Sequence, residues 1–110
     1  MGKAEGEIQK TILSYLEDDL GWPLVIRCNS GTVKMGGRFL RLAKKGTPDI
    51  VACCPHGTFV AFEVKTETGA ATHEQEQVIA RVRASGAHGA VVRSLPDVER
   101  CIKTWCGDHQ

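Results

Sequence analysis

The sequence lacks the features of a membrane, secreted or disulfide-stapled protein. None of its apolar runs approaches the length of about 18 residues that a membrane-spanning helix needs. Its first residues, MGKAEGE, contain no apolar stretch of the kind found in a signal peptide. It has five cysteines, an odd number, and none forms a C-x-x-C pair, which argues against a disulfide framework or a zinc knuckle. We therefore expect a soluble, cytoplasmic protein that does not associate with membranes.

Carboxylates are missing from the whole segment between Asp19 and Asp49. That segment contains Arg27, Lys34, Arg38, Arg41, Lys44 and Lys45, so it carries a charge of +6 although the net charge of the chain is only +1. A basic stretch beside an acidic remainder suits an anionic partner, with nucleic acid the leading candidate. The same pattern also fits a solvated hairpin with scattered charge.

The 110 residues, 42% of them apolar and 25% charged, have the composition of a single globular domain over residues 1–110. Hydrophobic periodicity and turn residues predict an element order of α-β-β-β-α-β-α. The expected helices cover about 5–20, about 73–85 and the residues after 94; the strands cover 24–28, 50–54, 58–64 and 90–93; and a basic hairpin or loop covers 32–46. The runs 50–54 and 58–64 are apolar on both faces, so they should be central in a covered sheet. This order predicts an α/β domain with a mixed central β-sheet flanked by helices.

The turn between the two central strands predicts which residues face each other. Pro55-His56-Gly57 is a three-residue loop, which places Asp49 directly opposite Glu63. Directly opposed side chains share one face of a sheet, with Cβ atoms about 5 Å apart. Lys65 points the same way as Glu63, whereas Val64 points into the opposite layer. Two carboxylates and an amine therefore converge at one end of the sheet, provided that no bulge shifts the register.

This carboxylate pair requires a counter-charge, because two like charges in a half-buried setting repel and each resists desolvation. A divalent cation such as Mg²⁺ would neutralise both through oxygen ligands. The alternative is a structural ion pair between one carboxylate and Lys65. We favour the metal site, since a bound cation can polarise a phosphate oxygen and activate water while Lys65 steadies the developing charge. The sequence offers no competing Ser-His-Asp or Cys-His nucleophile set, so these residues predict metal-assisted hydrolysis of a phosphodiester.

Two blocks of the sequence resemble the motifs of a nuclease superfamily. Gly46-Thr47-Pro48-Asp49 and Glu63-Val64-Lys65 are similar to those of PD-(D/E)xK nucleases, and more closely of the VRR-NUC (virus-type replication-repair nuclease) family. The likeness runs from Glu7 to about Arg100, and it includes Asn29-Ser30-Gly31, Gln75 and Val91-Val92-Arg93-Ser94. It implies a restriction-endonuclease-like core. The resemblance is to the stand-alone phage and bacterial members of the family.

The resemblance also implies roles for the residues around the carboxylate pair. Asp49 and Glu63, with the backbone carbonyl of Val64, would bind Mg²⁺ or Mn²⁺, and Lys65 would be the catalytic lysine. Glu7 would reach in from the first helix as a metal or water ligand. As an ordinary acidic residue of a first helical turn, Glu7 would instead only favour the helix dipole.

Gln75 has two roles open to it. The resemblance implies that Gln75 orients the catalytic groups from the second helix. The run Thr72-His73-Glu74-Gln75 also fits a capping box, with Thr72 as the cap and Gln75 at the third helical position.

The same resemblance implies that the basic segment contacts DNA. Arg27, Asn29 and Ser30 would lie beside the site and contact phosphates, although Asn29-Ser30-Gly31 also fits a plain turn. The DNA backbone would be held by Lys34, Arg38, Arg41, Lys44 and Lys45. With two Trp, one Tyr and three Phe and no recognition-helix pattern, the sequence offers no means of reading base edges, so DNA would be selected by shape.

The implied activity is that of a metal-dependent, structure-selective endodeoxyribonuclease in DNA repair. The stand-alone members resemble Holliday-junction resolvases, so we expect a homodimer that cuts four-way junctions without a small-molecule cofactor. Two subunits are needed for a paired cut across a two-fold junction. Two alternatives stay open: a flap, nicking or restriction-like nuclease on the same core, and a DNA-binding module without catalysis.

Overall fold

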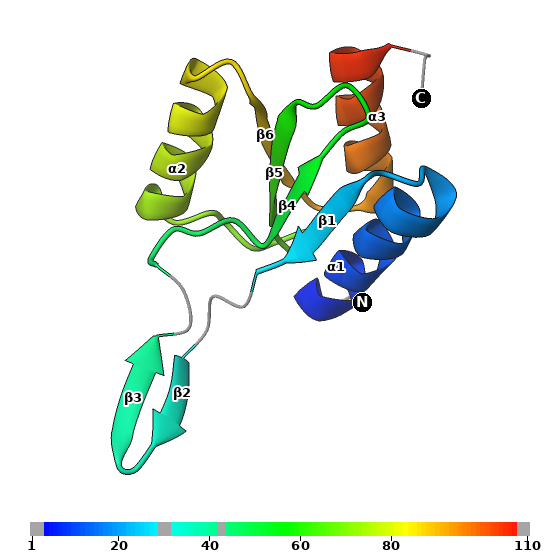
Figure 1. Cartoon of the computed structure of the whole chain (residues 1–110). Helices are drawn as coiled ribbons and strands as arrows, with labels where there is room; N and C mark the ends of the chain where they lie inside the picture. Colours follow the sequence, from blue (N-terminus) through cyan, green and yellow to red (C-terminus); the bar gives the residue numbers. More distant parts are fainter. Residues whose placement is uncertain (1–3, 29–31, 42–43, 108–110) are drawn as a thin grey trace.

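The computed structural model describes residues 4–28, 32–41 and 44–107 of the chain (Figure 1). In order, the elements are α1 (Glu5–Ser14), the π-helical turn η1 (Tyr15–Asp19), β1 (Leu24–Arg27), β2 (Thr32–Met35), β3 (Arg38–Arg41), β4 (Ile50–Cys53), β5 (Phe59–Val64), α2 (His73–Ala84), β6 (His88–Val92) and α3 (Leu95–Cys106). Each predicted helix and strand is present close to its expected bounds. In this part of the chain, no helix is long and apolar enough to cross a membrane.

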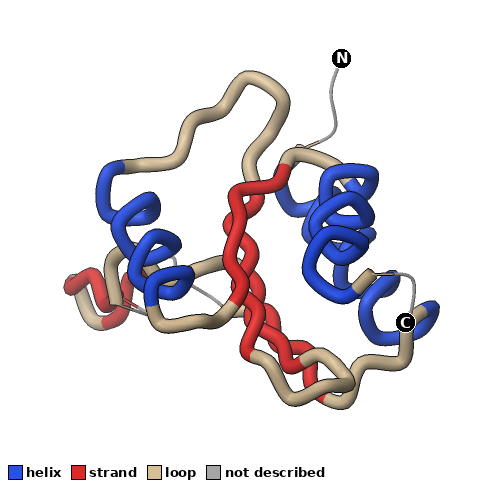
Figure 2. Tube along the Cα trace, turned by 90° about the horizontal axis from the view of Figure 1, so that it is seen from above, coloured by secondary structure: helices blue, strands red, loops and turns tan. Residues whose placement is uncertain are grey.

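Four strands form the central sheet in the order β1-β4-β5-β6. β1, β4 and β5 are antiparallel neighbours, whereas β6 is parallel to β5 because the chain crosses over through α2 between them. Figures 1 and 2 show α2 on one face of this sheet and α1 and α3 on the other. The predicted α/β architecture is therefore confirmed, and β4 and β5 are the central strands.

The main core lies between the sheet and the layer formed by α1 and α3. Ile8, Ile12 and Leu16 recur at helical spacing, and all three are buried. They belong to one apolar cluster with Ile50 of β4 and Phe62 of β5. The helical pattern in the sequence thus identified the face of α1 that packs on the sheet.

The turn between β4 and β5 has the predicted loop length and register. Ile50 pairs with Phe62 and Cys53 with Phe59, without a bulge. Gly57 closes the loop with a φ of +86°, a conformation that favours glycine, and its N–H donates to the carbonyl oxygen of Cys54. The register continues toward the other end of the strands, where it brings Asp49 and Glu63 opposite each other.

The segment left open as hairpin or loop contains a hairpin. β2 and β3 form a separate two-stranded sheet with Thr32 paired to Arg41 and Met35 to Arg38, and they turn at Gly36-Gly37. Figure 1 shows this pair, here termed the basic arm, extending away from the central sheet. The arm lies in the chain between β1 and β4, so it leaves the body at the end of the sheet that carries Asp49.

The segment that leads into β4 passes close to α2. Gly46 has a φ of +88°, and a Cβ atom there would lie 3.0 Å from the main-chain oxygen of Glu74 and 3.1 Å from Cγ2 of Val78. The neighbouring Lys45 places its Nζ 2.9 Å from Oε1 of Glu74. These contacts hold the approach to β4 against the first turn of α2, from which Gln75 projects.

We expect Gly46→Ala to destabilise the protein more than Gly57→Ala. Both glycines have positive φ, where an L side chain costs about 1–2 kcal/mol. A Cβ atom at Gly57 meets nothing within 4 Å, whereas one at Gly46 meets the main chain of α2. Gly46→Ala should therefore cost about 1–3 kcal/mol more. Urea denaturation measures both losses, and equal values would contradict the close approach.

Candidate active site

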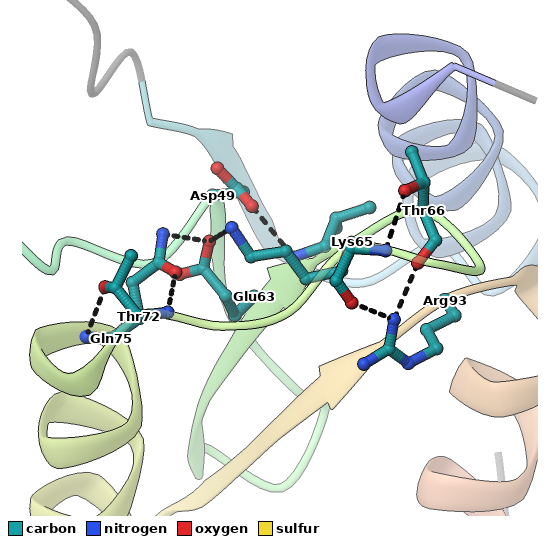
Figure 3. Close-up of polar contacts among 9 residues, drawn as sticks. Asp49, Glu63, Lys65, Thr66, Thr72, Gln75 and Arg93 are labelled. Carbon is teal, nitrogen blue, oxygen red and sulfur yellow. Dashed lines mark hydrogen bonds and ion pairs between the residues drawn. The ribbon is translucent and has the colours of Figure 1, made fainter.

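Asp49, Glu63 and Lys65 meet at one end of the central hairpin (Figure 3). Asp49 immediately precedes β4, Glu63 lies near the end of β5, and Lys65 directly follows β5. The exposed fractions of Asp49 and Glu63 are only 6% and 1%. The structure thus places the three predicted residues together and buries both carboxylates, an arrangement that has to be compensated by its surroundings.

Asp49 is held by the main chain of β5. Its Oδ2 accepts a hydrogen bond of 2.8 Å from the N–H of Val64. The next N–H along, that of Lys65, instead donates to the carbonyl oxygen of Val92 on β6. Because the N–H and C=O of one residue in an extended strand point to the same side, the carbonyl of Val64 is directed toward Asp49. The resemblance expects that carbonyl to bind the metal together with Asp49 and Glu63.

Glu63 is only half satisfied by its neighbours. Its Oε1 accepts a hydrogen bond of 2.9 Å from Nε2 of Gln75, and it lies 3.9 Å from Nζ of Lys65. Its Oε2 is buried and accepts no hydrogen bond from any residue that the structure describes. A buried carboxylate oxygen without a donor is costly unless a proton or a cation binds it.

Gln75 combines the two roles that the sequence left open. Its N–H donates to Oγ1 of Thr72, and its Oε1 accepts from the N–H of Thr72 at 2.8 Å, which completes the capping box of α2. The amide Nε2 of the same side chain remains available and donates to Glu63. One residue therefore both begins the helix and holds the carboxylate.

The environment of Glu63 favours its neutral form. Burial raises the pKa of Glu63 from its usual 4.5 to about 9, and hydrogen bonding to Asp49 and repulsion from its charge add to this rise. The Lys65 ammonium lowers the pKa, and the carboxylate of Glu5 raises it. In the metal-free protein at neutral pH, the carboxyl of Glu63 therefore carries a proton, which a cation bound there would release.

Cys28 borders this pair on the β1 side, a neighbour that the sequence did not single out. Its N–H donates to the carbonyl oxygen of Asp49 at 2.7 Å. Burial, followed by the negative charge of Asp49, raises the pKa of the Cys28 thiol. The thiol is thus protonated at neutral pH, and the donors of the site are carboxylate and carbonyl oxygens.

These residues fit a hard divalent cation. Mg²⁺ prefers oxygen ligands, is usually bound through one or two carboxylates, and keeps several waters. The unpartnered Oε2 of Glu63 and the adjacent carboxylate of Asp49 supply such donors. Over residues 4–28, 32–41 and 44–107, no three His, Cys, Asp or Glu side chains cluster closely enough to hold a metal ion by themselves.

No contact among the described residues joins Glu7 to this cluster, and its expected role as a metal or water ligand stays a prediction. Glu7 is exposed and lines a cavity on another side of α1, with Lys10 and Tyr15. Glu5 is the acidic residue of α1 whose charge acts on Glu63. At about 100° per residue, Glu5 lies on the same side of α1 as the buried Ile12, whereas Glu7 lies about 160° from Glu5 around the helix.

Gln9, one turn after Glu5, is a second polar residue that the sequence did not identify. It is buried, with 7% of its surface exposed, and its Oε1 accepts a hydrogen bond of 2.9 Å from Nε of Arg27. Strand alternation and this contact place Arg27 on the α1 side of the sheet, whereas Asp49 and Glu63 share the other face. Arg27 therefore contacts α1 through Gln9, and its expected contact with a phosphate beside the site stays a prediction.

The remaining predicted DNA contacts are distributed along the basic arm and its root. Asn29 and Ser30 lie outside the described residues. Lys34 belongs to β2, and Arg38 and Arg41 belong to β3. Arg38 and Lys44 are exposed, and Lys45 is also exposed but pairs with Glu74. Figure 1 shows the basic arm extending away from the central sheet, whereas Lys45 at its root lies against the first turn of α2.

Comparison with known proteins finds a relative by structure. No family model matches the sequence, and no curated protein matches it. A solved structure described as a VRR_NUC domain matches with a TM-score of 0.64 and 28% sequence identity, over 92% of this chain and 96% of that chain. The likeness thus extends over nearly the whole length of both chains.

The raised pKa of Glu63 makes the stability of the metal-free protein depend on pH. The folded-state pKa, about 9, lies above the unfolded value of about 4.5, so the native state holds an extra proton between these values. The stabilisation is complete below pH 4.5 and is lost as the pH rises toward 9. We expect the Tm measured by calorimetry in EDTA to fall over this range, and to fall less in Glu63→Gln, which keeps an acceptor for Gln75.

The matched control for this experiment is Glu17→Gln, because Glu17 is an exposed carboxylate on η1. This variant should retain the pH dependence of the wild type. A wild-type pH dependence in Glu63→Gln would show that the buried carboxyl does not carry the proton.

Proposed function

We propose that this chain, which is similar to a VRR_NUC domain over 92% of its length, is a metal-dependent, structure-selective DNA endonuclease that resolves four-way junctions as a homodimer. The observation that carries this proposal is the buried carboxylate pair of Asp49 and Glu63, with its unpartnered oxygen and the adjacent Lys65. A protein that only bound DNA would have no need for such a repulsive pair.

Asp49 and Glu63, with the carbonyl of Val64, would hold the cation. Mg²⁺ or Mn²⁺ would supply polarisation of a phosphate oxygen and would lower the pKa of bound water. The neighbouring residues of the chain would keep these oxygens in place. The N–H of Val64 fixes Asp49, and Nε2 of Gln75 fixes Glu63.

Lys65 is the residue proposed to act on the reacting phosphate. Its side chain is 13% exposed, so the ammonium is largely withdrawn from water while still bordering the site. In such a setting a positive charge stabilises developing negative charge more strongly than it does in bulk water. Water would be the nucleophile, and no covalent enzyme intermediate is required.

The basic arm is proposed to hold the DNA backbone. Arg38, at the turn of the arm, and Lys44, at its root, are exposed, and no carboxylate occurs between Asp19 and Asp49. Phosphate contacts of this kind position a duplex without reading its sequence. A branched substrate would then be selected by the path of its backbones, and two subunits would present two sites to a two-fold junction.

The first test is cleavage of end-labelled four-way junction, 5′ flap and linear duplex in Mg²⁺, in Mn²⁺ and in EDTA. We expect symmetric paired cuts in the junction that require metal, with the duplex spared. Cutting of flaps or duplex instead would retain the nuclease and contradict the junction preference. Absence of cutting by folded, metal-loaded protein would favour a DNA-binding module.

A second test separates the roles of the proposed catalytic residues. Lys65→Ala should lower the cleavage rate by about 10²-fold or more, because it removes charge stabilisation only. It should leave Mn²⁺ binding by calorimetry and DNA binding by anisotropy intact, whereas Asp49→Ala should lose metal binding as well. Lys103→Ala, at an exposed position of α3, is the control and should cleave at the wild-type rate. Undiminished cleavage by Lys65→Ala would overturn the mechanism.

A further inference from the structure

An arginine at the end of β6 holds the loop that connects Lys65, after β5, to Gln75, in the first turn of α2. Arg93 directly follows β6, and its Nη1 donates hydrogen bonds to the carbonyl oxygens of Thr66, at 2.6 Å, and of Gly69 (Figure 3). The carbonyl oxygen of Glu67 lies at 3.5 Å from the same nitrogen. All three acceptors are main-chain atoms of the loop that follows Lys65. The guanidinium therefore fixes the path of the backbone and does not depend on the side chains of the loop.

The loop itself is a tight turn. The N–H of Gly69 donates to the carbonyl oxygen of Thr66 at 3.2 Å and to Oγ1 of Thr66 at 3.1 Å. A Cβ atom on Gly69 would lie 3.0 Å from that Oγ1 and 3.9 Å from Cβ of Lys65. The turn thus lies beside the base of the Lys65 side chain, and a shift of the turn would move that side chain.

The end of β6 also holds Lys65 from its N-terminal side. The N–H of Lys65 donates to the carbonyl oxygen of Val92 at 3.0 Å. The N–H of Arg93 in turn donates to Oδ2 of Asp97, at 2.9 Å, in the first turn of α3. Val92 and Arg93, the second of which is anchored to α3, therefore hold the chain on either side of the Lys65 side chain.

We propose that Arg93 is a positioning residue, which holds the Thr66–Gly69 turn so that Lys65 and Gln75 both reach Glu63. The inference rests on the proposed function, because the positions of Lys65 and Gln75 affect a reaction only if Glu63 belongs to a nuclease site. The turn lies on the connection between Lys65 at the end of β5 and Gln75 in the first turn of α2. An arginine suits this task because its planar guanidinium offers several N–H donors in a fixed arrangement.

The kinetic test compares Arg93→Ala and Arg93→Lys with Arg100→Ala as a matched control. Arg100 is an exposed arginine of α3 that pairs with the other carboxylate oxygen of Asp97, so its removal takes away a nearby arginine and leaves the contacts of Arg93 in place. We expect Arg93→Ala to lower kcat by roughly 10- to 100-fold, since small misplacements of catalytic groups have effects of this size. The Kd for junction DNA and the affinity for Mn²⁺ should stay at their wild-type values, because Asp49, Glu63 and the basic arm are not altered.

The conservative variant adds a readout that a purely structural role would not produce. Arg93→Lys, which keeps one charged donor, should recover part of the kcat lost in Arg93→Ala, and Arg100→Ala should keep the wild-type kcat. If Arg93→Ala does not fold, Arg93→Lys carries the measurement and should show a smaller fall in kcat at unchanged DNA affinity. A wild-type kcat in the Arg93 variants, or a fall in DNA affinity as large as the fall in kcat, would overturn the proposal.

Amide hydrogen exchange tests whether Arg93 holds the loop, and it does so without relying on activity. In the Arg93 variants, exchange over residues 66–72 should accelerate while β4 and β5 stay as protected as in the wild type. Unchanged exchange in this loop would overturn the positioning role whether or not the protein cuts DNA. A wild-type protein that cuts no DNA, but whose loop exchange still depends on Arg93, would instead overturn the proposed function.

Discussion

The burial of two opposed carboxylates at the end of the β4–β5 hairpin is the constraint on which the rest of the site depends. Asp49 and Glu63 are almost inaccessible to water, and burial together with their mutual repulsion opposes the ionisation of Glu63. Their surroundings compensate this cost only in part: Val64 donates to Asp49, and Gln75 donates to Glu63. Because no described residue donates to Oε2 of Glu63, this oxygen is left to a proton or to a cation. That residual demand makes this end of the sheet suited to a cation.

The crossover through α2 serves the fold and the site at once. It makes β6 parallel to β5, and its first turn delivers Gln75 to Glu63. Gly46 packs against the same turn, and Arg93 at the end of β6 holds the loop that leads into it. Segments that are far apart in the chain therefore converge on the start of α2, so a change in any of them can be transmitted to the carboxylates.

Local rules were sufficient to predict the helices, the strands and the central hairpin. The register of β4 and β5 followed from the length of the loop, because a side-chain period of two residues leaves no freedom once the turn is set. For Gln75 the capping box and the contact with Glu63 were treated as alternatives. The structure has both, since an amide carries an acceptor on one atom and donors on another.

The sequence by itself determined the α/β class and the shared face of Asp49, Glu63 and Lys65, because both follow from periodicity and turn length among neighbouring residues. Only the tertiary structure decided that Arg27 turns toward α1 to meet Gln9, and that the guanidinium of Arg93 reaches back to the turn after Lys65. Contacts of this kind depend on how helices and strands pack against one another, and no local period in the sequence encodes that packing.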